Sequence, residues 1–406
     1  MRRPARLLVP LVAALFATLP SPAGAQNRAD SSLQDKLARA LAVPHVSRSG
    51  SAALAVELDT GSAVFARNAT TSLAPASTEK LPVTYAALTL LGPGFRIETD
   101  ALGEGEQVGS VWRGDIVLQG HGDPTLSSAG LRLLAKQLQA AGIRRISGSV
   151  VADESWFDER RTALGWKPSY YIDESPPLSA LVVDRARYGG HVSRDPALAA
   201  ALLFRDALRA AGVSVGGQVV TGSADADAFP LAFTESPTLA AIVRFMDRES
   251  DNFTAELLLK ELGAVSAGRG TTAAGAAVVM RQLAAAKVPL AGVRIVDGSG
   301  LSLLDRLTVG ALVGTLQAAW ADPRVRGPLL AALPVAGVNG TLEDRMRRAP
   351  ARGNVLAKTG TTDRASALAG FVRDRYVFAV LHNGRPLAYS WARIAQDRFA
   401  TVLAAQ

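Results

Sequence analysis

The chain of 406 residues has no cysteine, only seven lysines among its 44 basic residues, and four histidines. Because no disulfide can form, stability must come from burial of a hydrophobic core, which a chain of this length can achieve as two domains. The histidines show no metal-ligand spacing, and neither a P-loop nor a dinucleotide-binding fingerprint is present. We therefore expect no metal, no cofactor and no nucleotide chemistry.

The N-terminus has the pattern of a secretory signal. Three arginines among the first six residues precede an apolar run from Leu7 to Leu19, and Ala23-Gly24-Ala25 offers an A-x-A cleavage site. The run is too short to span a bilayer, and no later stretch is long enough. We predict a signal peptide at residues 1–25, a periplasmic or otherwise extracytoplasmic location, and no integral membrane segment after cleavage.

The positive charge of the chain is moderate and dispersed. The formal net charge is +8, and three of the arginines belong to the predicted signal. Long basic runs, which are typical of nucleic-acid-binding segments, are absent from the sequence. We expect no nucleic-acid partner.

Three short motifs each occur once, in a fixed order: Ser77-Thr78-Glu79-Lys80, Ser250-Asp251-Asn252 and Lys358-Thr359-Gly360. Such a set supplies a serine nucleophile, an amine that can take its proton, polar groups for a substrate amide and a second cation. Taken alone, the first motif is also typical of a capped helix start, the second of a helix N-cap, and the third of a strand that enters a turn. Together they predict an acyl-serine enzyme.

The local pattern predicts where these residues lie. Ser77 should open a helix, with Lys80 one turn later on the same face and with backbone N–H groups near the nucleophile. Pro82 should kink that helix, since proline removes a hydrogen bond.

Ser250 and Asn252 should lie on a connector between helices, the second of which ends at Gly263. Lys358 should lie on a strand of an antiparallel sheet and face a cleft.

Residues 95–235 have another character. Two units of helix, glycine and strand occur there, the first at about residues 131–151 and the second at about residues 202–220. The alternation predicts an inserted α/β domain.

Five further segments accompany the motifs: residues 122–126 (GDPTL), 151–153 (VAD), 297–302 (DGSGLS), 333–337 (LPVAG) and 368–371 (LAGF). With these, the chain resembles the low-molecular-mass penicillin-binding proteins of class C type, which are serine-type D-alanyl-D-alanine carboxypeptidases and endopeptidases with a large insertion. The resemblance implies an α/β (α+β) penicilloyl-serine transferase, or β-lactamase-like, fold with a five-stranded antiparallel sheet and helices. It implies a discontinuous catalytic domain at residues 26–94 and 236–406, interrupted by the insertion at 95–235. The nested domain that some relatives carry is expected to be absent.

The resemblance also implies roles for the motif residues. Ser77 would attack the carbonyl of the penultimate D-alanine, and Lys80 would accept its proton. Lys358 would help to keep Lys80 neutral and relay protons through Ser250. Asn252 would bind a substrate amide.

Substrate-binding roles follow for the third motif and for one residue of the insertion. Thr359 and Thr361, which flank Gly360, would hold the terminal carboxylate, and the N–H groups of Ser77 and Thr361 would form the oxyanion hole. Asp153 would bind the side chain of the third stem-peptide residue.

The implied partners are peptidoglycan peptides and β-lactam antibiotics, which would acylate the serine covalently. A β-lactamase shares all three motifs, but the 173 residues from Ser77 to Ser250 hold an additional domain that compact β-lactamases lack. A catalytically silent cell-wall binding protein is the second alternative. The sequence leaves open the balance between carboxypeptidase and endopeptidase activity.

Overall fold

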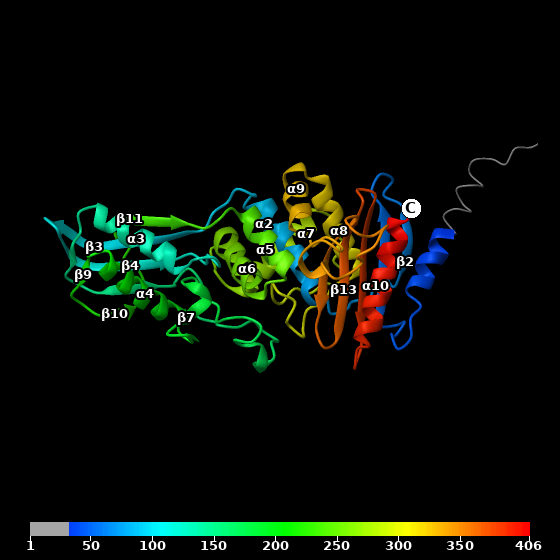
Figure 1. Ribbon diagram of the computed structural model, residues 1–406, viewed down its shortest axis with the longest axis horizontal. Helices are drawn as coiled ribbons and strands as arrows, with labels where there is room; N and C mark the ends of the chain where they lie inside the picture. The colour runs from blue at the N-terminus through cyan, green and yellow to red at the C-terminus, as the bar shows by residue number, and fades with distance from the viewer. Residues whose placement is uncertain (1–31) are drawn as a thin grey trace, which may run out of the picture.

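The computed structural model describes residues 32–406, so the predicted signal peptide lies outside the described residues. The molecule is elongated, with one β-sheet near each end and a group of helices between them (Figure 1). No helix within residues 32–406 combines the length and the apolar character needed to cross a membrane.

The sheet that contains the third motif has five strands in the order β12-β13-β14-β1-β2, and all its neighbouring strands are antiparallel. This confirms the predicted fold class. The strands are β1 (Ser51–Glu57), β2 (Ala63–Arg67), β12 (Val355–Thr361), β13 (Ala365–Val372) and β14 (Tyr376–Asn383).

Both faces of the five-stranded sheet are covered. Successive residues of a strand point to opposite faces, and accordingly Leu368 packs in one hydrophobic cluster with Phe399 of α10 (Tyr389–Ala404). Its neighbour Ala367 belongs to a second cluster on the other face, which includes Leu316 of α8 (Val309–Ala321). Every residue of β13 is therefore buried.

The helices between the sheets are α2 (Lys80–Leu90), α5 (Leu239–Glu249), α6 (Asn252–Ala267), α7 (Thr272–Ala285) and α9 (Pro323–Ala332). The prediction that α6 ends at Gly263 is wrong, because the helix continues for one more turn. A Cβ atom at Gly263 would lie 2.8 Å from the backbone nitrogen of Gly275 on α7. Gly263 therefore permits close packing of two helices rather than ending one.

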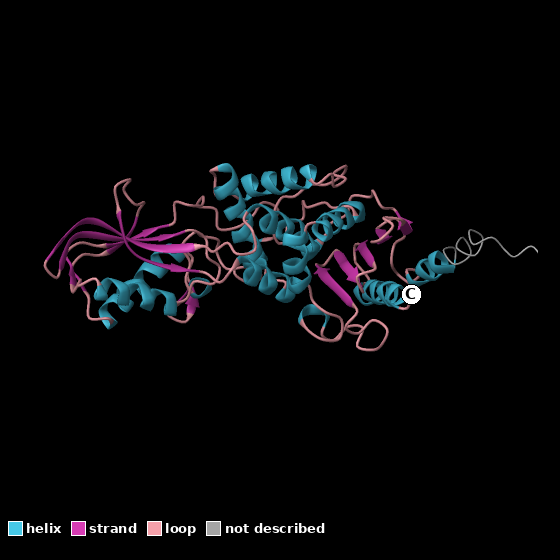
Figure 2. Cartoon of the chain, turned by 90° about the horizontal axis from the view of Figure 1, so that it is seen from above, coloured by secondary structure: helices cyan, strands magenta, loops and turns pink. Residues whose placement is uncertain are grey.

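The second sheet has seven strands with the main order β10-β6-β4-β3-β11, and β5 and β9 lie off this path. Its strands are β3 (Glu98–Val108), β4 (Val111–Gly120), β5 (Arg145–Ile146), β6 (Val150–Asp153), β9 (Ser214–Val215), β10 (Val219–Thr221) and β11 (Phe229–Glu235). The helices α3 (Ser128–Ala140) and α4 (Pro196–Ala210) lie on the same side of it (Figure 2).

Both helix, glycine and strand units predicted for the insertion are present, but each predicted strand is divided in two. The first is interrupted at residues 147–149, where a Cβ atom at Gly148 would lie 2.4 Å from the carbonyl oxygen of Gly114. The second is interrupted at residues 216–218. The short hairpin of β7 (Arg187–Tyr188) and β8 (His191–Val192) precedes α4.

Candidate active site

The predicted nucleophile lies in a short 3₁₀ helix just before an α-helix. Ser77 belongs to the 3₁₀ helix η1 (Ala76–Glu79), and α2 begins at Lys80. Pro82 therefore occupies the first turn of the α-helix, where N–H groups have no partner within the helix. The prediction of a kink at Pro82 is corrected: the change in geometry from 3₁₀ to α comes earlier, at Lys80.

Residue 76 is held in an unusual backbone conformation beside the nucleophile. Ala76 has a φ of +48°, in the left-handed region that residues with a Cβ rarely adopt. Such strain persists where the surrounding structure fixes it, and it is concentrated at functional sites. The backbone thus presents Ser77, which is partly exposed, at the surface of a cavity.

The first two motifs meet at the amine of Lys80. Its Nζ donates to Ser77 Oγ at 3.1 Å, to Asn252 Oδ1 at 2.9 Å and to the Ser299 carbonyl at 2.8 Å. The side chain is fully buried. The predicted proton acceptor is therefore in hydrogen-bond contact with the predicted nucleophile.

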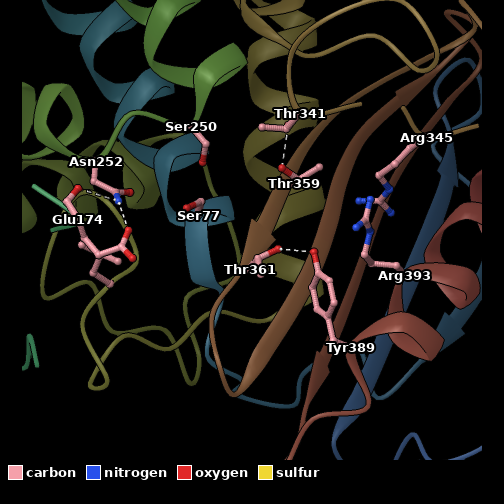
Figure 3. A pocket seen from close by; sticks show the side chains of 11 residues that line it. Ser77, Glu174, Ser250, Asn252, Thr341, Arg345, Thr359, Thr361, Tyr389 and Arg393 are labelled. Carbon is pink, nitrogen blue, oxygen red and sulfur yellow. Dashed lines mark hydrogen bonds between the residues drawn. The ribbon is translucent and has the colours of Figure 1, made fainter. Parts of the chain in front are cut away.

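The second and third motifs meet in the same way. Lys358 Nζ donates to Ser250 Oγ at 2.8 Å and to the Thr359 carbonyl at 3.0 Å. Ser250 has a left-handed backbone, with φ of 60°, at the end of α5, so the chain can turn there into α6. The structure thus brings Ser77, Lys80, Ser250, Asn252 and Lys358 together, and three of them are drawn in Figure 3.

Burial makes both amines weaker bases. It lowers the pKa of Lys80 to about 8, against the opposing effect of nearby carboxyl groups such as Asp297. Burial, together with the charge of Lys80, lowers the pKa of Lys358 to about 7. Each amine can therefore lose its proton near neutral pH, as a general base requires.

A cluster of buried carboxyl groups lies close to Lys80: Glu79, Asp247, Glu256, Asp297 and Asp305. Burial raises the pKa of Glu256 to about 8 and that of Asp247 to about 6, and it also raises the pKa of Glu79 and Asp305. The charges of Asp297 and Asp247 raise the pKa of Lys80, but loss of solvent around the buried amine is the larger effect. The pKa of Lys80 therefore stays below its usual value despite the cluster.

Strand β12 runs directly past the nucleophile. A Cβ atom at Gly360 would lie 2.8 Å from the Pro75 carbonyl oxygen and 3.1 Å from the Ser77 nitrogen. Only glycine fits this approach without displacing backbone. The geometry suits an oxyanion hole that combines the N–H groups of Ser77 and Thr361, the residue after Gly360.

A cavity of about 480 Å³ opens at this point. Its lining is Ser77, Glu174, Ser250, Asn252, Leu301, Thr341, Arg345, Thr359, Thr361, Tyr389 and Arg393. Thr359 Oγ1 donates to Thr341 Oγ1 at 2.8 Å, and Thr361 is exposed (Figure 3). The two threonines of the third motif therefore share one cavity with the nucleophile.

Three charged residues of this lining were missed by the sequence analysis: Glu174, Arg345 and Arg393. Glu174 comes from the inserted segment, and Asn252 Nδ2 donates to its carbonyl at 3.2 Å and to its Oε2 at 3.4 Å. None of the three belongs to a motif, so only the folded chain shows that they face the nucleophile.

The structure does not place Asp153 on the wall of this cavity, so its role in substrate binding stays a prediction. This residue ends β6, is fully buried and does not line the cavity. Its Oδ2 accepts from Gln119 Nε2 at 2.7 Å and from the Ala224 nitrogen at 2.9 Å, and its Oδ1 accepts from the Ser155 nitrogen at 2.8 Å. The carboxylate is thus occupied in joining segments of the insertion, and Glu174 is the acid of the insertion that reaches the cavity.

A serine hydroxyl in contact with a buried lysine amine, at the edge of a cavity, is an arrangement typical of serine enzymes of the acyl-transfer class. The family described as D-Ala-D-Ala carboxypeptidase 3 (S13) matches residues 33–194 and 189–406, and the chain belongs to it. This confirms the recognition of the chain as a serine carboxypeptidase related to penicillin-binding proteins.

Individual relatives agree. A D-alanyl-D-alanine carboxypeptidase of Actinomadura sp. (strain R39) is 30% identical over 496 residues, which cover 99% of this chain and 90% of the relative. A carboxypeptidase of Mycobacterium tuberculosis is 34% identical, with coverage of 85% and 78%. The crystal structure of penicillin binding protein 4 from Haemophilus influenzae has a TM-score of 0.78 at 22% identity and covers 93% of this chain and 98% of its own, which supports the fold.

Proposed function

We propose that the protein removes the terminal D-alanine from peptidoglycan stem peptides through an acyl-serine intermediate formed on Ser77. The observation that carries this proposal is the contact of Ser77 Oγ with the buried amine of Lys80, at 3.1 Å and at the edge of a cavity. A serine hydroxyl is a weak nucleophile until a neighbouring base takes its proton.

In the acylation step, Ser77 Oγ attacks the carbonyl carbon of the penultimate D-alanine, and the neutral Lys80 amine takes the hydroxyl proton. The N–H groups of Ser77 and Thr361 stabilise the negative charge on the carbonyl oxygen. The C–N bond then breaks, and Lys358 supplies a proton to the leaving amine through Ser250. The pKa of Lys358, about 7, suits such a donor.

In the deacylation step, water replaces the leaving amine. Lys80 first passes the proton it took from Ser77 to Lys358 by way of Ser250, which restores both amines to their starting state. Lys80 then takes a proton from the water, the hydroxide adds to the ester carbonyl, and the Ser77 oxygen leaves and receives that proton back from Lys80. Throughout, Asn252 and the two threonines Thr359 and Thr361 hold the substrate. Glu174 restrains the Asn252 amide through the two contacts described above.

β-Lactam antibiotics are proposed as covalent inhibitors of the same serine. Their amide is part of a ring, so the leaving amine stays attached after the C–N bond breaks and obstructs the entry of water. The penicillin binding protein 4 of Haemophilus influenzae, which shares the fold, was solved in complex with a β-lactam. This supports an equivalent adduct at Ser77.

We propose the domain division given by the sequence, with a catalytic domain at 26–94 and 236–406 and an insertion at 95–235 that lacks a nested domain. The family match consists of two segments, which overlap at residues 189–194 of this chain. Such a break is typical of a chain that lacks some of the positions that the family has between the two segments. The alignment with the Actinomadura relative spans 496 residues, more than this chain contains, which also supports a missing segment. The proposed cell-wall substrate places the mature chain outside the cytoplasm.

Digestion of defined muropeptides by the wild type and by Ser77→Ala, followed by mass spectrometry, tests the proposal. We expect loss of one D-alanine from pentapeptides with the wild type alone. Equal activity of both proteins would refute it. Rapid turnover of a chromogenic cephalosporin, without a lasting adduct on Ser77, would favour a β-lactamase instead. Absence of any hydrolysis or adduct would favour a silent binding protein.

A further inference from the structure

The cavity is positively charged on the side away from Glu174. Beyond Thr361 and Tyr389, its lining is completed by Arg345 and Arg393, whose guanidinium groups point toward one another in Figure 3. Glu174 lies at the opposite side, beside Asn252. The cavity therefore has one acidic and one basic end.

The two arginines differ in how their charge is balanced. Arg345 is only 6% exposed, and it donates to Asp397 Oδ1 at 2.7 and 3.0 Å and to Gln396 Oε1 at 3.1 Å. Arg393 makes no ion pair or hydrogen bond with any residue in the described range 32–406. Its guanidinium lies 5.4 Å from the centre of the Tyr389 ring, on its own helix α10. A partly exposed and unpaired cation thus faces the cavity.

The position of Arg393 relative to the nucleophile fixes which part of a substrate it can meet. In the proposed reaction, Thr359 and Thr361 hold the carboxylate next to the leaving amine. Tyr389 lies directly beyond, since its hydroxyl is 3.4 Å from Thr361 Oγ1, and Arg393 lies beside Tyr389. Arg393 is therefore on the side of the leaving group.

We propose that Arg393, with Arg345 fixed beside it, forms a subsite for a second carboxylate on the leaving group, and that this subsite favours cleavage of cross-linked peptides. The inference rests on the proposed function. A single D-alanine has one carboxylate, which the threonines already hold. A leaving group that is a second stem peptide carries additional carboxylates, and an arginine fork binds such a group with charge-assisted hydrogen bonds.

The reaction itself is unchanged by this subsite. Ser77 forms the ester, the C–N bond of the cross-link breaks, and the amine of the second stem peptide takes a proton and leaves. Water then releases the first stem peptide. Only the recognition of the departing peptide depends on Arg393.

The test compares three substrates. They are a monomeric pentapeptide, a D,D-cross-linked dimer with free carboxylates, and the same dimer in which the carboxylates of the acceptor peptide are amidated, except the one next to the leaving amine. In Arg393→Ala, we expect kcat/KM for the free-acid dimer to fall about tenfold, chiefly through KM. The value for the pentapeptide should change less than about twofold, within the range of a lost weak contact. Amidation should impose a similar loss on the wild type and no further loss on the variant.

Arg398→Ala is the matched control, because Arg398 lies on the same helix, is exposed and does not line this cavity. It should behave as the wild type. Unfolding followed by circular dichroism confirms that both variants are folded. Equal loss on pentapeptide and dimer would overturn the inference, since Arg393 would then serve a carboxylate common to both. An unchanged dimer rate would also overturn it. A wild type that cleaves neither substrate would instead refute the proposed function, and the subsite with it.

Discussion

The two sheets of the molecule relate to the cavity in different ways. The five-stranded sheet is packed on both faces, and its edge strand β12 itself supplies Lys358, Thr359 and Thr361. The seven-stranded sheet packs against α3 and α4, and none of its strands lines the cavity. Its domain reaches the cavity through the loop that carries Glu174.

Besides the contacts of Glu174 with Asn252, that loop makes further contacts with the catalytic side. Trp166 Nε1 donates to Asp297 Oδ2 at 2.8 Å, and Lys167 forms an ion pair with Asp363 at 2.8 Å. The difference between the regions is that the two amines proposed to move protons, Lys80 and Lys358, are buried on the regular elements α2 and β12, which hold geometry to fractions of an ångström. The insertion is proposed to contribute to recognition instead.

The largest expected effect is that of Lys80→Gln. Removal of the base should lower the rate of D-alanine release by about 10³-fold, within the range for general-base catalysis. Lys136→Gln, an exposed lysine on α3 of the insertion, should leave the rate unchanged. Release of D-alanine from a synthetic pentapeptide measures both. Similar rates for Lys80→Gln and the wild type would contradict the division between the regions.

Gly360→Ala should slow acylation by about 100-fold, because a displaced backbone shifts the nucleophile relative to the strand beside it. The added Cβ would lie 2.8 Å from the Pro75 carbonyl oxygen. The control is Gly327→Ala on α9, where a Cβ would meet nothing within 4 Å. Stopped-flow binding of a fluorescent penicillin reports the rates. If both variants acylate equally fast, the close approach of β12 has no role.

Glu256→Gln should change how stability depends on pH. Glu256 has a folded-state pKa of about 8 against 4.5 for an unperturbed glutamate, so the folded state binds the additional proton between these values. The free energy of unfolding therefore decreases as pH rises from 4.5 to 7, by about 3 kcal/mol for this one group. The variant should lack that decrease, whereas Glu106→Gln, at an exposed position of β3, should retain it. Urea unfolding at pH 4.5 and pH 7 measures the free energy of unfolding of each protein. If this free energy changes with pH by the same amount in all three proteins, a buried, protonated Glu256 is excluded.

Acylation of the wild type should depend on pH in a bell-shaped way. The reactive form has a neutral Lys80, whose pKa is about 8, and a protonated Lys358, whose pKa is about 7, so the rate should rise about fivefold from pH 6 to pH 7 and fall again above pH 8. Because two amines are coupled here, the measured midpoint belongs to the pair. Acylation by penicillin across this range, with circular dichroism at each pH, tests the expectation. A rate that is flat from pH 6 to pH 8 would show that no amine needs to lose its proton.

The smallest effect is expected from Glu174→Gln, the change in the insertion loop. It weakens one hydrogen bond to the Asn252 amide, and such a bond contributes about 1 kcal/mol, so kcat/KM should fall about fivefold. Glu159→Gln, in the same connecting segment but outside the cavity lining, is the control. Steady-state kinetics on the pentapeptide measure both. A loss as large as that of Lys80→Gln would place a catalytic group in the insertion and abolish the contrast drawn above.

Much of the fold could be predicted because the relevant signals are local. The local pattern predicted that Lys358 lies on a strand of an antiparallel sheet, which is β12, and the helix, glycine and strand units predicted α3 and α4. The predictions failed where packing overrides local preference. Gly263 reads as a helix end, yet it lies inside α6 because α7 approaches so closely. Strand β3 was missed because its polar and glycine-rich sequence shows no apolar alternation.

The sequence by itself determined the reactive groups. A serine three residues before a lysine, with Ser-Asp-Asn and Lys-Thr-Gly farther along, specifies which atoms can do the chemistry, because side-chain identity and helical spacing are properties of the chain. Only the tertiary structure decided which charges surround them. Lys80 and Asn252 are 172 residues apart and meet at 2.9 Å, Asp153 is buried away from the cavity, and Arg393 faces it. Burial and long-range contacts set these environments, and both arise only when distant segments pack together.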